Sequence, residues 1–336
     1  VVGREGMFLL GNTLLVIMAA VTLVGTTLPV ITSAFTTRPL SVGAPFYNSV
    51  VAPMGLLLAG VMAIGPILVY GTAAAGSLRR GLVIPSIITA AIVGLAALSG
   101  IHHPWALTTL AIAVLAVAII LLTFDTAARS QMRRAGLGPF LATLRVIDSN
   151  HRRYGGQLTH LGVVLLLLGI AGSSLYSTHD SVTLAPGDTI QAGRYQLRLE
   201  RIADERRANY TTVTATVSLI GRDGATRTLS PERRFYDKAE GASSEVAIRS
   251  GLREDLYIAL SGWENGGARV ALEVLINPLV MWIWIGTVVI ILGALFALPR
   301  HLLPRPRLAA ERLNRAAETP RRPRPDAVAQ PVMERS

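Results

Sequence analysis

Six long apolar runs without charged side chains constrain the fold of this chain more than any other feature. Each has about 18 residues or more, which is enough for a helix to cross a hydrocarbon core of roughly 30 Å. Lipid offers no hydrogen bonds to the backbone, so each run is expected to form a transmembrane α-helix. The first run is longer than the apolar part of a cleavable signal peptide and is expected to remain as a span. The runs cover residues 7–28, 50–71, 82–101, 105–124, 157–175 and 278–298.

The positive charge of the chain gathers in alternate loops between these runs. All but one of the 32 basic residues are arginine, and the formal net charge is +11. The basic positions outside the segment 176–277 are chiefly Arg4, Arg79, Arg80, Arg129, Arg133, Arg134, Arg145, Arg152, Arg153, Arg300, Arg305 and Arg307. The positive-inside rule then places both termini in the cytoplasm and residues 176–277 outside. A basic face with interleaved aromatics is missing, which argues against nucleic-acid binding.

The segment 176–277 has a different pattern from the rest of the chain. Between 212 and 219, Val, Ala and Leu alternate with Thr and Ser, and shorter alternations follow the same period elsewhere in the segment. A period of two with one polar face predicts half-buried antiparallel strands. Turn signals at 186–188, 222–224 and 265–267 separate these strands. We therefore expect a small β-barrel or β-sandwich.

The predicted fold class is a polytopic α-helical membrane protein of about six spans with an inserted β-rich domain. The amphipathic spacing of Phe140, Leu141, Leu144 and Ile147 predicts a helix along the inner membrane surface. The expected parts are five spans in 1–175 with a basic cytoplasmic loop at 125–156, the external β domain at 176–277, the sixth span at 278–298, and a disordered basic tail at 299–336.

The chain contains no cysteine. Disulfides, thiolate metal sites and cysteine nucleophiles are therefore excluded for this chain. Phosphate-binding glycine loops, Ser-His-Asp patterns and paired carboxylates do not stand out either. Asp125 and Asp148 fit helix-end charges, and Asn12 in the first run fits a role in helix packing.

His160 is the strongest candidate for a functional residue, because it lies inside the fifth apolar run. An ionisable side chain within a span is costly and normally faces a partner or a site. Counting from Arg153, His160 lies about 10 Å into the helix, in the inner-leaflet half. A stripe of small residues accompanies it at Gly155, Thr159, Gly162, Gly169 and Ser173, and such a stripe admits another helix or a flat macrocycle. Two roles remain open: an axial ligand of haem iron, or a helix–helix hydrogen bond.

The other histidines carry weaker signals. His102 and His103 form a pair at the turn between the third and fourth runs, where an external haem or metal site is conceivable but a turn role is favoured. His151 and His301 stand beside arginines and are expected to be solvated or to contact headgroups. His179 begins the external segment and is expected at the surface.

Several ordered motifs resemble the CcmF/NrfE family of haem lyases, over nearly the whole chain except the C-terminal tail. The motifs are Arg4-Glu5-Gly6, Ser41 to Asn48, the run from Gly155 to Gly162, Pro231 to Tyr236, Glu245 to Arg249, Asp255-Leu256-Tyr257, Asn277 to Val280 and Trp282 to Gly286. The resemblance implies a bacterial inner-membrane protein with the topology given above.

The resemblance also implies a function. Members of this family attach haem, as substrate, to the cysteines of a Cys-x-x-Cys-His motif in apocytochrome c. They work with a periplasmic haem chaperone and a thiol-handling apocytochrome partner. They hold a permanent haem b between two transmembrane histidines, and quinol is the suggested reductant. His160 matches the second of these ligands.

Features of the N-terminal half of the family are absent from this chain. They include the tryptophan-rich segment for the delivered haem, its two flanking external histidines and the first transmembrane ligand. We therefore expect a half-enzyme that supplies one axial imidazole and the β domain, and that needs an N-terminal half or subunit. The alternative function is a non-catalytic membrane scaffold that docks maturation partners through the β domain. A transporter is disfavoured because the spans show no repeated halves.

Overall fold

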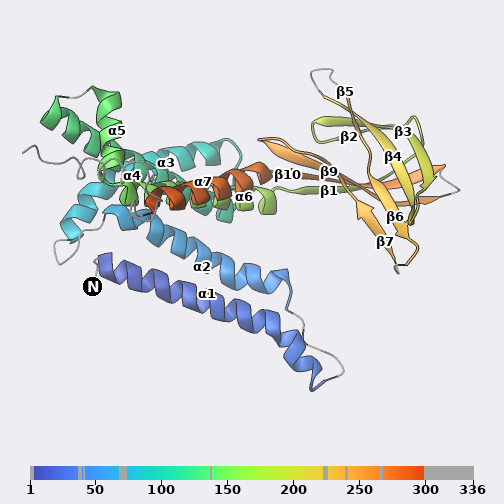
Figure 1. Ribbon diagram of the computed structural model, residues 1–336, viewed down its shortest axis with the longest axis horizontal. Coiled ribbons are helices and arrows are strands. Elements are labelled where there is room, and N and C mark those ends of the chain that lie inside the picture. The colour runs from blue at the N-terminus through green and yellow to red at the C-terminus, as the bar shows by residue number, and fades with distance from the viewer. Residues whose placement is uncertain are drawn as a thin grey trace, which may run out of the picture. The chain divides into compact units, whose positions relative to one another are not determined.

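The computed structural model describes residues 4–36, 40, 42–67, 74–136, 138–221, 226–238, 241–264 and 268–298. The expected tail at 299–336, His301 and the turns expected at 222–224 and 265–267 lie outside these residues. The helices are α1 (Arg4–Ser33), α2 (Ala44–Ile64), the short 3₁₀ helix η1 (Gly65–Ile67), α3 (Ala74–Leu98), α4 (Pro104–Ala135), α5 (Pro139–Ser149), α6 (His151–Leu175) and α7 (Val280–Ala297) (Figure 1).

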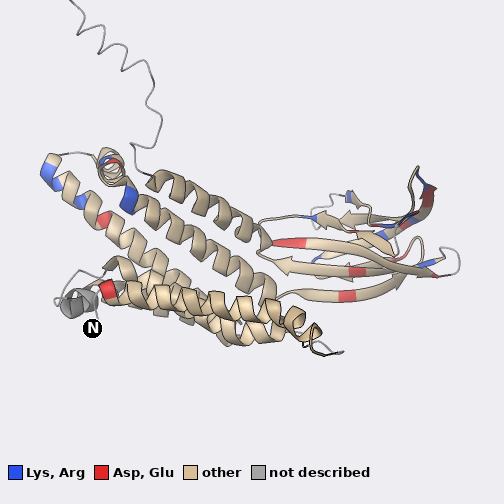
Figure 2. Cartoon of the chain, turned by 60° about the horizontal axis from the view of Figure 1, so that its bottom comes forward, with Lys and Arg blue, Asp and Glu red and all other residues tan. Residues whose placement is uncertain are grey.

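Six of these helices, all but α5 and η1, are long and apolar enough to cross a membrane. Figure 2 shows them almost entirely tan, with coloured charged residues near their ends. The last turn of α4 carries Arg133 and Arg134, and α6 begins with His151, Arg152 and Arg153. The charges thus frame the apolar segments, as the cost of burying charge in lipid requires.

The segment between the fourth and fifth apolar runs is largely helical. α4 continues to Ala135, supported by an ion pair of Arg129 with Asp125 one turn earlier at 2.9 Å. It ends where Gly136 adopts a left-handed φ of 61°, a common way for a helix to terminate. α5 then starts with Pro139 in its first turn and buries Ala142 and Val146, while Phe140, Leu141 and Leu144 stay exposed.

The β domain is a sandwich of two antiparallel sheets (Figure 1). The strands are β1 (Thr178–Leu184), β2 (Thr189–Ala192), β3 (Tyr195–Arg206), β4 (Tyr210–Ile220), β5 (Thr226–Leu229), β6 (Glu232–Tyr236), β7 (Ala242–Glu245), β8 (Ala247–Arg249), β9 (Glu254–Glu264) and β10 (Arg269–Pro278). One sheet has the order β1-β10-β9-β8, and the other has the order β2-β3-β4-β6-β7 with β5 paired to β4.

The core of the sandwich comes from the alternation read in the sequence. Val213, Ala215, Val217 and Leu219 of β4 point inward and meet the inward residues of β9 and β10. The intervening threonines and serine of β4 lie on the other face of the strand. The predicted fold class, apolar spans with an inserted β-rich domain, is confirmed, and the sandwich is the form that the domain takes.

α6 and α7 pack with their backbones almost in contact. A methyl carbon built on Gly162 would lie 2.7 Å from the carbonyl oxygen of Gly286, and one on Gly286 would lie 2.6 Å from that of Gly162. At Gly293 a methyl carbon would lie 2.5 Å from the Thr159 nitrogen. Only glycine permits such an approach, and small residues at helix interfaces give close van der Waals packing in membranes.

The junction between β10 and α7 is held by hydrogen bonds from the loop 250–253. Leu279 has a φ of 60°, which is rare for leucine, and its N–H donates to the Arg253 carbonyl at 3.0 Å. The Trp282 indole N–H donates to the Leu252 carbonyl at 2.8 Å. Buried Asp255 accepts from the Gly251 N–H at 2.9 Å. The loop therefore connects the sandwich directly to the first turn of α7.

Replacing Gly162 by alanine is expected to destabilise the chain by about 1–3 kcal/mol, because the new methyl group would push against the α7 backbone. Thermal unfolding of the detergent-purified chain, followed by circular dichroism, measures the effect. Gly156→Ala is the matched control on the same helix, since nothing lies within 4 Å of its added methyl carbon. Equal losses in the two variants would contradict the packing argument.

Replacing Asp255 by alanine is expected to cost about 1–3 kcal/mol, because the half-buried Gly251 N–H loses the acceptor that buried Asp255 provides. The loop should also become easier to cleave after Arg249 and Arg253. Limited trypsinolysis, with the unfolding midpoint, tests both effects. Glu264→Ala, at the exposed end of β9, should leave both readouts unchanged.

Candidate functional site

His160 lies on α6, and its side chain is half-buried. α6 begins at the Asn150 cap, whose side-chain oxygen accepts from the Arg153 N–H at 3.2 Å. Val164 follows His160 by four residues and therefore shares its side of the helix. Val164 is 1% exposed, in a cluster with Ala63 of α2 and alanines of α4. His160 thus stands one helical turn from the packed centre of α2, α4 and α6.

The stripe of small residues is on the opposite side of α6 from His160. With about 100° per residue, Gly155, Gly162 and Gly169 all fall about 180–220° away from the imidazole. The backbone of α7 and its Ile283 and Ile290 side chains occupy this side. The sequence allowed either a helix or a macrocycle against this stripe, and the structure places helix α7 there. A macrocycle bound at His160 would have to approach another side of α6.

The imidazole of His160 makes no hydrogen bond or ion pair with any residue that the structure describes. The helix–helix hydrogen bond that the sequence left open therefore has no partner in this part of the chain. An ionisable side chain within a span that lacks a partner is a functional-site candidate on physical grounds.

Gln157, one turn before His160, was not marked in the sequence analysis. Its side chain is 5% exposed, and neither the amide nitrogen nor the amide oxygen has a hydrogen-bond partner within the described chain. Leaving a buried amide unsatisfied costs about 1–3 kcal/mol, so such groups call for an explanation. The signal available in the sequence was a glutamine inside an apolar run, beside the histidine.

An apolar cavity of about 500 Å³ lies along α4, between α3 and α6. Val164, Leu165 and Leu168 line it from α6, and among the described residues Asp125 of α4 is the only charged one in its lining. His160 does not line this cavity. The cavity extends from the turn that follows His160, along the same side of α6 as Val164.

The remaining candidate residues do not converge on one site. His102 is exposed, and His103 caps the start of α4 with a buried Nδ1 that has no described partner. His151 opens α6, and Asn12 is exposed on α1. His179 is 57% exposed on β1, 3.8 Å from Glu273. Asp125 pairs with Arg129, while Asp148 is exposed on α5.

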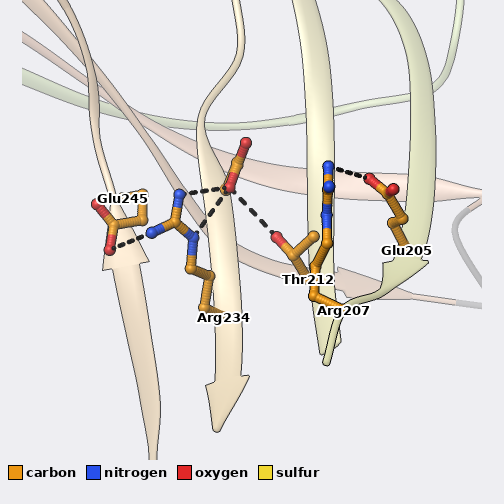
Figure 3. Close-up of polar contacts among 6 residues, drawn as sticks. Glu205, Arg207, Thr212, Arg234 and Glu245 are labelled. Atoms are coloured by element: carbon orange, nitrogen blue, oxygen red, sulfur yellow. Dashed lines mark hydrogen bonds and ion pairs between the residues drawn. The ribbon is translucent and has the colours of Figure 1, made fainter. Parts of the chain in front are cut away.

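A ladder of ion pairs joins β6 and β7 of the six-stranded sheet. Arg234 pairs with the carboxylates of Glu232 at 3.0 Å and Glu245 at 3.2 Å. Figure 3 shows its guanidinium beside Glu245. Thr212 also contacts Glu232, at 3.4 Å. Because Arg234 is shared between two carboxylates at a partly solvated surface, this ladder fits a structural role.

A second polar cluster closes one end of the sandwich. The hydroxyl of buried Tyr195 accepts hydrogen bonds from Arg194 and Arg249, each at 2.9 Å. Arg194 also pairs with Glu254 at 2.6 Å. The bond to Tyr195 and the Glu254 carboxylate raise the pKa of Arg194, so this guanidinium stays charged. This cluster was not predicted from the sequence, because its members lie far apart along the chain, at the start of β3, the end of β8 and the start of β9.

The residues present fit haem better than a metal ion held by protein alone. Within the described residues, no three His, Asp or Glu side chains come together. An imidazole without a described partner in apolar surroundings is compatible with an axial haem ligand, since the porphyrin itself supplies the other ligands of the iron.

Comparison with known proteins gives a consistent result. Residues 175–278 match the family model described as the CcmF C-terminal beta-sandwich. Cytochrome c-type biogenesis protein CcmF of Pseudomonas aeruginosa is 32% identical over 303 residues, which is 89% of this chain and 44% of that protein. The Haemophilus influenzae CcmF is 31% identical over 88% of this chain and 44% of its own length.

The solved structure titled Cytochrome c Heme Lyase CcmF has the same fold. It superposes with a TM-score of 0.70 and 24% identity over 88% of this chain and 46% of its own. The chain thus spans about half the length of the relatives that it matches. Because these matches agree with the β-sandwich and the apolar helices, the chain belongs to the CcmF family and corresponds to the C-terminal half of its members.

Proposed function

We propose that this chain is the C-terminal part of a cytochrome c haem lyase and that His160 is one axial ligand of a transmembrane haem b. The observation that carries the proposal is a half-buried imidazole within a span, with no partner among the described residues. The names of the relatives, which refer to cytochrome c biogenesis and haem lyase, support the reaction class. The complete activity would be the attachment of substrate haem to Cys-x-x-Cys-His apocytochrome c.

The proposed roles of the residues follow from their positions. His160 would present one neutral ring nitrogen to the iron, and the second axial ligand would come from the N-terminal half or subunit. Haem b, when bound, would supply one-electron redox chemistry, for which quinol is the proposed reductant. Gln157 would position the site, because its buried amide has hydrogen-bonding capacity that the described chain does not use. Hydrogen-bonding groups next to a metal ligand commonly orient that ligand and tune the metal.

The proposed topology follows from charge. The arginines at the end of α4 and the start of α6 would face the cytoplasm of a bacterial inner membrane, and the β sandwich would stand in the periplasm. There it would meet the haem chaperone and the thiol-handling apocytochrome partner. α5, with exposed Phe140 and Leu141, would lie along the inner surface.

Replacing His160 by glycine is expected to abolish the b-type α-band in reduced-minus-oxidised spectra, because the iron loses an axial ligand. The chain is co-expressed with the N-terminal part of a haem lyase of this family, and membranes are measured. Added imidazole should restore the band, which distinguishes a lost ligand from a misfolded protein. His151→Gly, at the start of the same helix, should keep it. An unchanged band in His160→Gly would refute the assignment.

Replacing Gln157 by leucine is expected to separate stability from haem binding. The chain alone should become no less stable, since a buried unsatisfied amide is removed. Haem b occupancy, measured as pyridine haemochrome per protein, should fall by about tenfold or more. Thr159→Val is the control, because it removes a polar group from the side of α6 that faces α7. Unchanged occupancy in Gln157→Leu would give the glutamine no role at the haem.

The alternative function, a docking scaffold, has one observation in its favour. Val246 and Ile248 are 40% and 51% exposed at the β8 edge of the four-stranded sheet, where a partner protein could cover them. If a co-purifying N-terminal part brought no haem b to the complex, this alternative would replace the redox role.

A further inference from the structure

The end of the sandwich that adjoins α7 is fixed at the level of the membrane surface. α7 has 18 residues and no charged side chain, so it is about 27 Å long and has no length to spare across a core of roughly 30 Å. Its first residues must therefore lie at the edge of the hydrocarbon. Trp282 and Trp284 lie within the first two turns of α7, and tryptophans are common at such an interface.

The loop 250–253 is hydrogen-bonded to this same turn of α7. The Leu252 carbonyl accepts from the Trp282 indole, and the Arg253 carbonyl accepts from the Leu279 N–H. Asp255, which is 3% exposed, holds the loop from the other side through the Gly251 N–H. The loop is thus tied both to the sandwich and to the helix, and it must stand at the interface with Trp282.

The side chains of this end combine an apolar residue with unpaired positive charge. Leu252 is 65% exposed, so its apolar side chain is available for contact with lipid. Arg253 is exposed and has no hydrogen bond or ion pair from its side chain within the described residues. Arg249 contacts the Tyr195 hydroxyl but no described carboxylate. The Glu254 charge is taken by Arg194, and Asp255 is buried.

We propose that this end of the sandwich, formed by Leu252, Arg249 and Arg253, docks on anionic phospholipid in the leaflet nearest the β domain. Leu252 inserts at the boundary of headgroups and acyl chains, and the two guanidiniums bind lipid phosphate. Arginine suits this role because its planar fork donates two parallel hydrogen bonds to phosphate oxygens. Basic residues next to a span bind anionic lipid in the same way.

The lipid contact would fix the sandwich on the bilayer at a second point. α6 and α7 enter it at β1 and β10, and the loop 250–253 would add the supporting contact beside β8. The sandwich could then not tilt about its two helical connections. The ion-pair ladder in Figure 3 lies on a different sheet and would stay free of lipid contact.

The absence of cysteine makes the test direct, because one label can be placed on an otherwise unchanged chain. The full chain, with a fluorophore on Leu252→Cys, is placed in nanodiscs of phosphatidylcholine with or without phosphatidylglycerol. The label should be shielded from water, and brominated phosphatidylglycerol should quench it better than brominated phosphatidylcholine. A label on Glu264→Cys, at the other end of β9, should remain accessible to water and unquenched.

Charge removal tests the arginines separately from the label position. With Arg249→Gln and Arg253→Gln together, half-maximal quenching should need about tenfold more brominated phosphatidylglycerol, or should not be reached. Arg207→Gln with Arg269→Gln removes the same charge elsewhere and should change nothing.

Two results would overturn the proposal. One is a Leu252 label as exposed to water as the Glu264 label in both kinds of nanodisc. The other is shielding of the Leu252 label that does not depend on phosphatidylglycerol, since the loop would then have no preference for anionic lipid.

Discussion

The contact between the α6 and α7 backbones is the interaction on which the rest of the structure depends. Gly162 and Gly286 allow each helix to touch the other's carbonyl oxygens, with no side chain between them. α6 is followed by β1, and β10 continues into α7, and β1 pairs with β10 along the full length of β1. The glycine contact between α6 and α7 therefore brings together β1 and β10, two neighbouring strands of the four-stranded sheet.

The β domain shows why this arrangement needs a defined junction. An antiparallel pair leaves the membrane with a fixed direction, and any swivel at the helix ends would move the whole sandwich. Leu279, in a left-handed conformation, makes the turn from strand to helix within one residue. Its strain is offset by the Arg253 carbonyl, the Trp282 indole bond and the buried Asp255 carboxylate behind them.

The sequence predicted the fold class and the candidate histidine, but not the surroundings of that histidine. Uncharged runs and strand alternation depend on periods along the chain, which a single sequence displays directly. Helical geometry predicts that the stripe of small residues on α6 faces away from His160. It does not predict that α7 packs against this stripe. The lack of a hydrogen-bond partner for Gln157, and the binding of Arg194 and Arg249 to the same Tyr195 hydroxyl, depend on contacts between segments that are distant in the sequence. Such contacts leave no periodic pattern in the sequence.

A metal ligand on a helix is useful only if the helix can neither rotate nor slide. Rotation of α6 by one residue would swing the His160 side chain by about 100°, away from any site that it serves. Gly155, Gly162 and Gly293 oppose this movement, because each faces backbone atoms of the neighbouring helix that a rotated side chain would strike. The glycines opposite His160 would thus preorganise this side chain for the proposed role as a ligand, which requires a precise position.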